Sequence, residues 1–115
     1  MLTKGQVVSV ELPGTGGHEQ GGRRPAMVVR DMRAEDGKAQ NILLIPFTTA
    51  AGARRFAYTL VVDPSTTNGL QHQSVLLGFH MQAVDSRRVG SLLGKLDDTV
   101  LRQVDALLSD MLGLG

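Results

Sequence analysis

Short runs of alternating hydrophobic and polar residues fill most of the chain before residue 97, and this period of two is typical of β-strands. In the first run, over residues 6–12, two valines alternate with Ser9 and Glu11. Pro46, near the end of a later run, predicts an edge position or a bulge, because proline has no N–H to donate to a neighbouring strand. The apolar runs predict further strands over residues 26–30, 41–48, 56–62 and 74–84, with a short last strand over 89–96.

The end of the chain has a helical period instead. Its apolar residues form one stripe, typical of an amphipathic helix that packs on a core: Val100, Leu101, Val104, Leu107, Leu108, Met111 and Leu112. We expect Asp97 to cap this helix, Leu96 and Leu101 to staple its start, and Gly113 to end it. The whole pattern predicts one α+β domain over residues 1–115, with short antiparallel strands curled into a small barrel and one C-terminal helix.

Composition narrows the chemistry of this domain. The 115 residues are 42% hydrophobic and include no cysteine, which excludes disulfides, a thiol nucleophile and cysteine-bound zinc. The three histidines His18, His72 and His80 lie far apart in the sequence, so we predict no metal site and no cofactor. No signal peptide opens the chain and no apolar run approaches the ~20 residues that span a bilayer, so we expect a cytoplasmic protein that does not enter membranes.

The charge is divided between the two halves of the chain. Residues 1–60 hold eight Lys and Arg against five Asp and Glu (+3), and residues 61–115 hold four against six (−2). Arginine outnumbers lysine nine to three, and its planar fork suits phosphate or carboxylate groups. An ordinary solvated surface with ion pairs explains the same pattern. If the charge does bind phosphates, the candidate contacts are Arg23, Arg24, Arg54 and Arg55.

The most unusual segment is a glycine-rich loop over residues 13–23, which holds five glycines in eleven residues. A phosphate-binding P-loop is excluded, because the last glycines precede Arg23-Arg24-Pro25 and not Lys-Ser/Thr. A dinucleotide fingerprint is excluded as well, because a strand follows and not a helix. We expect the loop to fold over a cleft as a flap, hinged at Arg24 and Pro25, or to be a plain solvent loop with an Arg24 salt bridge.

This loop, Gly-His-Glu-Gln-Gly-Gly-Arg-Arg-Pro-Ala over residues 17–26, resembles the loop between the first two strands of the MazF/PemK/Kid-type toxins of bacterial toxin–antitoxin pairs. Residues 44–48 (Leu-Ile-Pro-Phe-Thr) are similar to an apolar strand of that family that ends in a functional threonine. The similarity continues through residues 74–77, 83–85 and 94–98, so it covers nearly the whole chain.

The resemblance implies a homodimer of SH3-like barrels that cleaves single-stranded RNA at selected sequences, without a metal ion, and is neutralised by an antitoxin protein. By the same analogy, Arg24 and Thr48 take the two central catalytic positions. A guanidinium can stabilise the charge that grows on a phosphate during cleavage, and a hydroxyl can add a further donor. The substrate-contacting loop positions of the family fall on His18, Glu19 and Gln20.

One stretch departs from the family pattern. Many relatives carry an acidic residue followed by Gln, with Arg two residues later, whereas this chain has Phe79-His80-Met81-Gln82. In a strand over residues 74–84, Phe79 falls on the apolar face, so we expect it in the core. His80 falls on the polar face beside Gln82, as a substitute acid or base, a surface for base stacking, or a partly buried histidine without a role in chemistry.

Two other functions compete with the nuclease. A CcdB-like protein shares the implied fold but poisons DNA gyrase without cutting nucleic acid, and such proteins do not usually share the Glu-Gln-Gly-x-Arg-Pro loop. A catalytically inactive member of the family that only binds partners is the other alternative, and Phe79 favours it. The glycine loop favours the nuclease.

Overall fold

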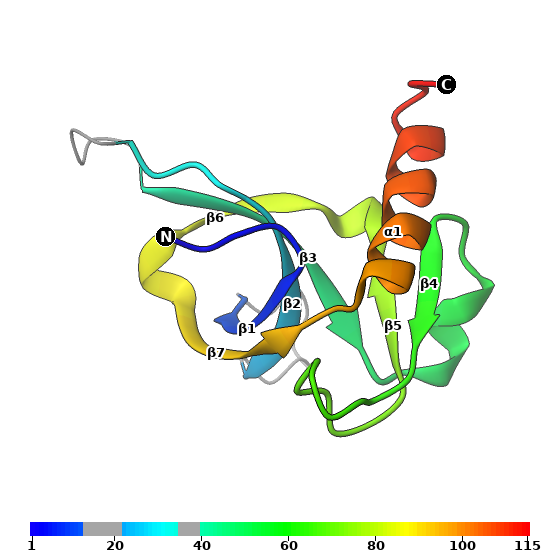
Figure 1. Cartoon of the computed structure of the whole chain (residues 1–115), viewed down its shortest axis with the longest axis horizontal. Coiled ribbons are helices and arrows are strands. Elements are labelled where there is room, and N and C mark those ends of the chain that lie inside the picture. Colours follow the sequence, from blue (N-terminus) through cyan, green and yellow to red (C-terminus); the bar gives the residue numbers. More distant parts are fainter. Residues whose placement is uncertain (13–21, 35–39) are drawn as a thin grey trace.

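The structure is a computed structural model that describes residues 1–12, 22–34 and 40–115 (Figure 1). The predicted flap residues His18, Glu19 and Gln20 lie outside the described residues. No helix in the described ranges is long and apolar enough to span a bilayer.

Strands dominate the described part of the chain, and one α-helix ends it (Figure 1). The strands are β1 (Gln6–Glu11), β2 (Arg23–Asp31), β3 (Asn41–Thr48), β4 (Thr59–Val62), β5 (Ser74–Leu77), β6 (Gln82–Asp85) and β7 (Val89–Lys95). Three short 3₁₀ turns, η1 (Ala51–Arg55), η2 (Gly78–His80) and η3 (Ser86–Arg88), connect them, and α1 spans Asp98–Met111. The predicted last strand is therefore confirmed, whereas β2 begins three residues earlier and β4 three residues later than predicted.

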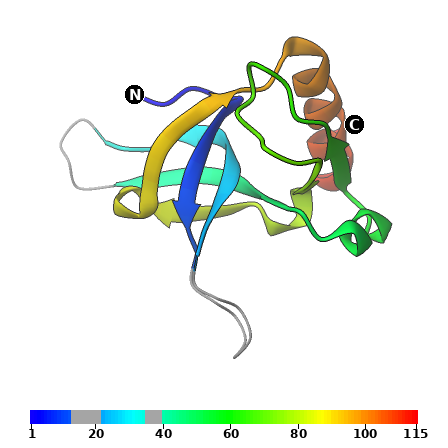
Figure 2. The same cartoon turned by 90° about the horizontal axis from the view of Figure 1, so that it is seen from below.

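The strands form one antiparallel sheet in the order β4-β5-β3-β2-β1-β7, with β6 also paired to β3. The sheet curls strongly without closing, and α1 packs across one end of it (Figure 2). The predicted α+β class, with antiparallel strands and a C-terminal helix, is confirmed. The barrel-like curl is present, but β4 and β7 remain the two ends of the pairing order.

The single strand predicted over residues 74–84 is wrong, because η2 divides it into β5 and β6. Both pieces pair with β3: Leu44 pairs with Gln82, and Phe47 pairs with Leu76. Leu44 and Phe47 are three residues apart in β3, whereas their partners Gln82 and Leu76 are six residues apart. The segment from β5 to β6 therefore carries three extra residues, which bulge out as η2. Pro46 lies on β3 between the two paired segments. An irregularity is therefore present at Pro46, but the extra residues belong to the neighbouring strand, and β3 is not an edge strand.

Both faces of the central strands are buried, which explains why their apolar runs are nearly continuous. Val7, Met27 and Ile45 belong to a core that α1 covers, and their neighbours belong to a second core inside the curl of the sheet. This second core consists of Val8, Val10, Ala26, Val28, Ile42, Leu44 and Val84.

The ends of α1 follow the sequence signals. The side chain of Asp97 accepts a hydrogen bond from the Val100 N–H at 2.9 Å, as expected of a cap. Gly113 has a φ of 70°, in the left-handed region that glycine adopts at little cost, and ends the helix. Leu96 is buried in the core against which Leu101 packs, so the start of the helix is anchored as predicted.

Asp31, at the end of β2, ties the N-terminus to the sheet. Its carboxylate accepts hydrogen bonds from the Leu2 N–H at 3.0 Å and from Nε of Arg33 at 2.9 Å. Only 2% of its side chain is exposed. The hydrogen bond with the Arg33 guanidinium holds the pKa of Asp31 far below its ordinary value of 3.8.

We predict that Asp31→Asn lowers the free energy of unfolding by about 1–2 kcal/mol at pH 7, because charge-assisted hydrogen bonds to a buried oxygen are lost. Since the folded pKa is lowered, the carboxylate contributes fully above about pH 4 and its contribution fades as the pH falls towards that pKa. The gap between wild type and variant should therefore narrow below pH 4 in urea titrations. Asp85→Asn, which removes an exposed pair with Arg87, is the matched control and should cost less. A gap that stays constant from pH 7 to pH 2.5 contradicts the assignment.

Candidate functional site

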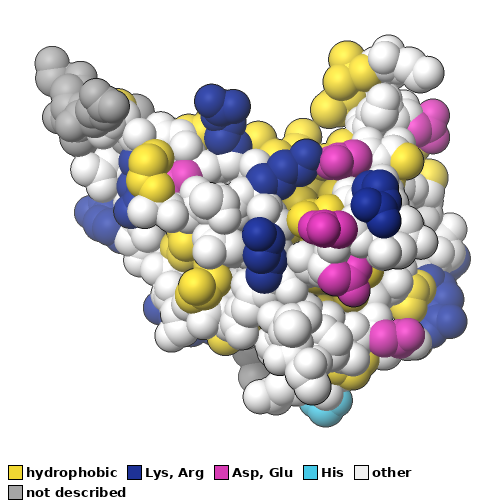
Figure 3. Space-filling model, in the orientation of Figure 1, with side chains coloured by type: hydrophobic (Ala, Val, Ile, Leu, Met, Phe, Trp, Pro, Cys, Tyr) yellow, Lys and Arg dark blue, Asp and Glu magenta, His cyan; other side chains and the backbone are white. Residues whose placement is uncertain are grey.

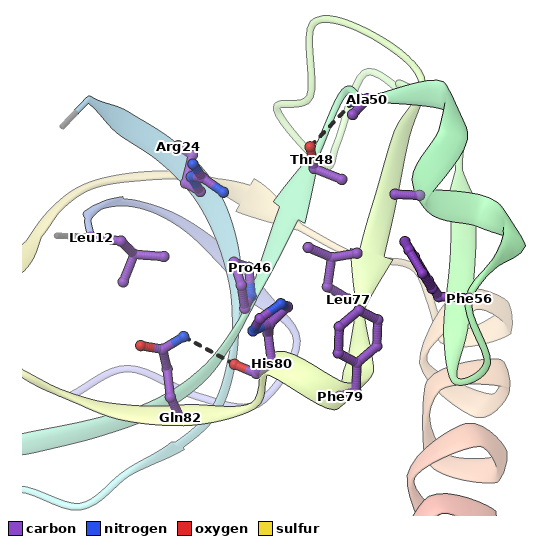
Figure 4. A pocket seen from close by; sticks show the side chains of 11 residues that line it. Leu12, Arg24, Pro46, Thr48, Ala50, Phe56, Leu77, Phe79, His80 and Gln82 are labelled. Carbon is purple, nitrogen blue, oxygen red and sulfur yellow. Dashed lines mark hydrogen bonds between the residues drawn. The ribbon is translucent and has the colours of Figure 1, made fainter. Parts of the chain in front are cut away.

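Three adjoining cavities meet at Arg24. In one of them, β2 and β3 face the two turns η1 and η2 (Figure 4). The largest, which we call the cleft, has a volume of about 450 Å³, and the other two have about 280 and 270 Å³. The residues that line the cleft are Leu12, Arg24, Pro46, Thr48, Ala50, Ala53, Phe56, Leu77, Phe79, His80 and Gln82.

The structure brings together the two residues predicted at the centre of the site. Ala26 pairs with Pro46 across β2 and β3, and Arg24 and Thr48 each lie two residues beyond this pair on their strands. Both residues line the cleft and the second cavity. Because side chains alternate along a strand, Arg24 lies on the same face as Ala26 and extends from the end of the second core.

Arg24 has no charged partner among the described residues. Its side chain is half-buried, and among the described residues it has neither a hydrogen bond nor an ion pair. None of the described residues that line the three cavities is acidic. The salt bridge for Arg24 that the sequence left open is thus not formed within the described part of the chain. No described side chain therefore competes with an anion for this guanidinium.

Thr48 ends β3 and turns its side chain toward the cleft (Figure 4). Its hydroxyl oxygen accepts a hydrogen bond from the Ala50 N–H at 3.2 Å. This bond fixes the position of the oxygen, and the hydroxyl proton has no acceptor in the described ranges, so it remains a donor that can face an anion beside Arg24.

The expectation that Phe79 lies in the core is wrong. Because η2 interrupts the strand, the side-chain alternation is lost, and 44% of Phe79 is exposed on the cleft wall. Its ring lies edge-on to Phe56 with centroids 5.9 Å apart, and tilted against the ring of His80 at 4.6 Å. His80 is itself exposed and lines the cleft between Phe79 and Pro46 (Figure 4). It is therefore not a partly buried histidine.

A close backbone approach holds η2 in place. The Gly78 N–H donates to the Tyr58 carbonyl oxygen at 2.9 Å, and a Cβ at position 78 would stand 2.5 Å from that oxygen and 2.6 Å from Cδ2 of Leu107. Only glycine fits this contact. Tyr58 has a φ of 60°, a conformation that costs a non-glycine residue free energy and that makes the tight turn before β4. The turn and η2 together place Phe56 against Phe79.

The other arginines predicted to bind phosphate divide into two groups. Arg23 lines the two smaller cavities, with Nη1 only 2.5 Å from where a Cβ of Gly90 would be. Arg54 donates to Oε1 of Gln73 at 3.3 Å, and the guanidinium carbon of Arg55 lies 4.8 Å from the centre of the Phe56 ring. Neither Arg54 nor Arg55 lines the cleft, and both stand beside it on η1.

The cleft, whose described lining residues include no acidic side chain, differs in charge from the face seen in Figure 3. On that face, Lys and Arg side chains lie among Asp and Glu side chains. There, Lys4 pairs with Asp105. Within the described ranges, no group of three His, Asp or Glu side chains is placed to hold a metal ion. The residue that sequence reasoning missed is Phe56. The available signal was its position directly after Arg54 and Arg55, since basic residues interleaved with aromatics are typical of nucleic-acid contacts.

Comparisons with known proteins bear on the family and the fold of the chain. A family model described as the PemK-like, MazF-like toxin of type II toxin–antitoxin systems matches residues 3–112. The sequence has no match among curated proteins.

Solved structures share the fold over nearly their full length. The MazF structure from Deinococcus radiodurans is 30% identical with a TM-score of 0.70, covering 96% of this chain and 94% of that one. The MazE–MazF complex from the same organism is 29% identical with a TM-score of 0.71, covering 97% and 96%. A mycobacterial endoribonuclease in complex with its cognate antitoxin has a TM-score of 0.73 and covers 100% and 98%, and at 19% identity it shows the fold alone.

Proposed function

The chain belongs to the PemK-like, MazF-like toxins of type II toxin–antitoxin systems, and from this premise we propose that it is an endoribonuclease that cleaves single-stranded RNA at selected sequences without a metal ion. The observation that carries the proposal is the Arg24 guanidinium, which has no partner among the described residues and lines an open cleft together with Thr48. None of the described residues that line this cleft is acidic. Such a site repels no phosphate and offers several donors to one.

The chemistry needs little beyond these donors. In metal-free cleavage, the 2′-hydroxyl loses its proton and its oxygen bonds to the adjacent phosphorus. The bond from phosphorus to the 5′-oxygen breaks, that oxygen takes up a proton, and a 2′,3′-cyclic phosphate remains. Negative charge grows on the non-bridging oxygens as the 2′-oxygen bonds to phosphorus. Two aligned N–H groups of Arg24 and the O–H of Thr48 would stabilise that charge.

His80 is a candidate for moving the protons. It is exposed, lines the cleft with Arg24 and Thr48, and imidazole can exchange protons near neutral pH. His18 and Glu19 of the glycine loop are the other candidates, and Gln20 would contact the substrate. Arg23, Arg54 and Arg55 would bind phosphates on either side of the cleaved bond.

We also propose two protein partners. One is a second copy of the chain, because each subunit of this size has a modest core and the family resemblance implies pairing. The other is an antitoxin with an acidic or amphipathic segment, which would compete with RNA for Arg24 and its neighbours. The antitoxin complexes among the structural relatives support this second proposal.

The function is tested by incubating the purified protein with a long RNA in EDTA and mapping the cut sites. We expect cuts at a recurring sequence that end in 2′,3′-cyclic phosphates, with no gain from added magnesium. A strict requirement for magnesium would contradict the metal-free mechanism. Absence of cuts by a folded protein would overturn the nuclease, and inhibition of DNA gyrase by the same sample would establish the CcdB-like alternative.

Arg24→Ala should lower kcat/KM for a defined RNA by about 10²–10³-fold, because a donor to the developing charge is lost. Arg24→Lys should also be poor, since an ammonium lacks the planar fork. Arg30→Ala removes the same charge from the same strand at an exposed position that lines none of the three cavities, and should retain activity. Near-normal turnover by Arg24→Ala would refute the assignment.

Thr48→Val should lose about 10²-fold in kcat while the melting temperature changes little, because valine keeps the shape and only the hydroxyl is removed. Thr48→Ser restores the hydroxyl and should recover most of the rate. The measurement is single-turnover cleavage of one RNA by all three proteins. If Thr48→Val cleaves like wild type, the strand end is merely structural.

A further inference from the structure

Two of the three phenylalanines in the chain are exposed, although burial of such side chains is favourable. Phe47 is 1% exposed, in the core, whereas Phe56 and Phe79 are 47% and 44% exposed. Both exposed rings lie on one wall of the cleft, next to His80 (Figure 4). We call Phe56, Phe79 and His80 the aromatic platform.

The rings of the platform are ordered against one another. Phe56 meets Phe79 at an interplanar angle of 67°, and Phe79 meets His80 at 43°. The Arg55 guanidinium covers Phe56 from the η1 side. The backbone under the rings is fixed by the contact of Gly78 with Tyr58. A ligand that stacks here therefore finds rings already in position, which lowers the entropy lost on binding.

Two arginines add positive charge near the platform. Arg55 lies against Phe56, and Arg24 lines the same cleft as all three rings. Flat exposed rings near arginines suit a strand that presents a base and phosphates together, because every base has a face that stacks and each phosphate meets a cation. An apolar protein side chain would use the rings and leave the two guanidinium charges uncompensated.

We propose that the aromatic platform stacks one unpaired base of the RNA strand whose phosphate binds at Arg24 and Thr48. This inference rests on the proposed function and adds a determinant of binding to it. It gives the altered segment Phe79-His80 a role: where many relatives place an acidic residue and a glutamine, this chain places rings that hold a base. Phe79, the central ring of the platform, carries most of the effect.

The test measures whether removing a ring of the platform weakens RNA binding only when the RNA carries bases. Binding is followed by fluorescence anisotropy with two probes: a ten-nucleotide mixed-sequence 2′-O-methyl RNA, whose blocked 2′-oxygen prevents cleavage, and the same strand without bases. Phe79→Leu keeps an apolar side chain and removes the ring. We expect it to weaken binding of the strand with bases by about 5- to 150-fold and to leave binding of the abasic strand unchanged.

Two variants complete the design. Leu92→Ala alters an exposed apolar side chain on β7 that lines none of the three cavities, and should change neither affinity. Phe56→Leu should repeat the effect of Phe79→Leu in weaker form, and it carries the test if Phe79→Leu melts early.

Each result bears on the proposal separately from the nuclease activity. Equal loss on both strands, or no loss on either, overturns base stacking, and a protein side chain is then the remaining occupant of the rings. If the wild type cleaves RNA but the variants show equal loss or no loss, the nuclease proposal is supported and only base stacking on the platform is refuted. Loss confined to the strand with bases, in a protein that cuts no RNA, supports the platform and refutes the nuclease. No RNA binding by wild type overturns both.

Discussion

The site depends on the three extra residues that β5 and β6 carry relative to β3. A regular strand would pair with β3 along its whole length and cover Pro46. Pro46 pairs with Ala26 of β2 but has no N–H to donate, so leaving it unpaired on the side of β5 and β6 costs little, and the chain turns outward there as η2. The outward turn opens the cleft beside β3 and moves Phe79 and His80 from strand positions to its wall. The register of β2 and β3 then places Arg24 and Thr48 on the facing side.

The larger features of the fold follow from the sequence because they depend on local signals. The period of two gives the strands, the apolar stripe gives α1, and Asp97 and Gly113 mark its ends. Pro46 indicates a bulge, although only the paired residues show that the irregularity belongs to the neighbouring strand. The glycine loop and the threonine after an apolar run make Arg24 and Thr48 candidates, and the fold places both on the lining of the cleft.

The aromatic side of the site could not be derived in the same way. Phe79 fits the alternation of a continuous strand, so a periodic pattern assigns it to the core. What moves it outward is a contact between Gly78 and the carbonyl of Tyr58, which are twenty residues apart in sequence, and a positive φ at a tyrosine that no propensity predicts. Tertiary contacts of this kind decide the direction in which a single side chain points, and they produce no periodic pattern in the sequence.

If Arg24 acts as proposed, its charge, which no described residue pairs, sets selection for stability against selection for activity. A carboxylate within ion-pairing distance of the guanidinium would stabilise the protein before it binds an anion. The same change would repel the anion that we propose the cleft receives. Mutations that help the fold in this way are therefore the ones that evolution is expected to discard, and drift toward greater stability must proceed elsewhere in the chain.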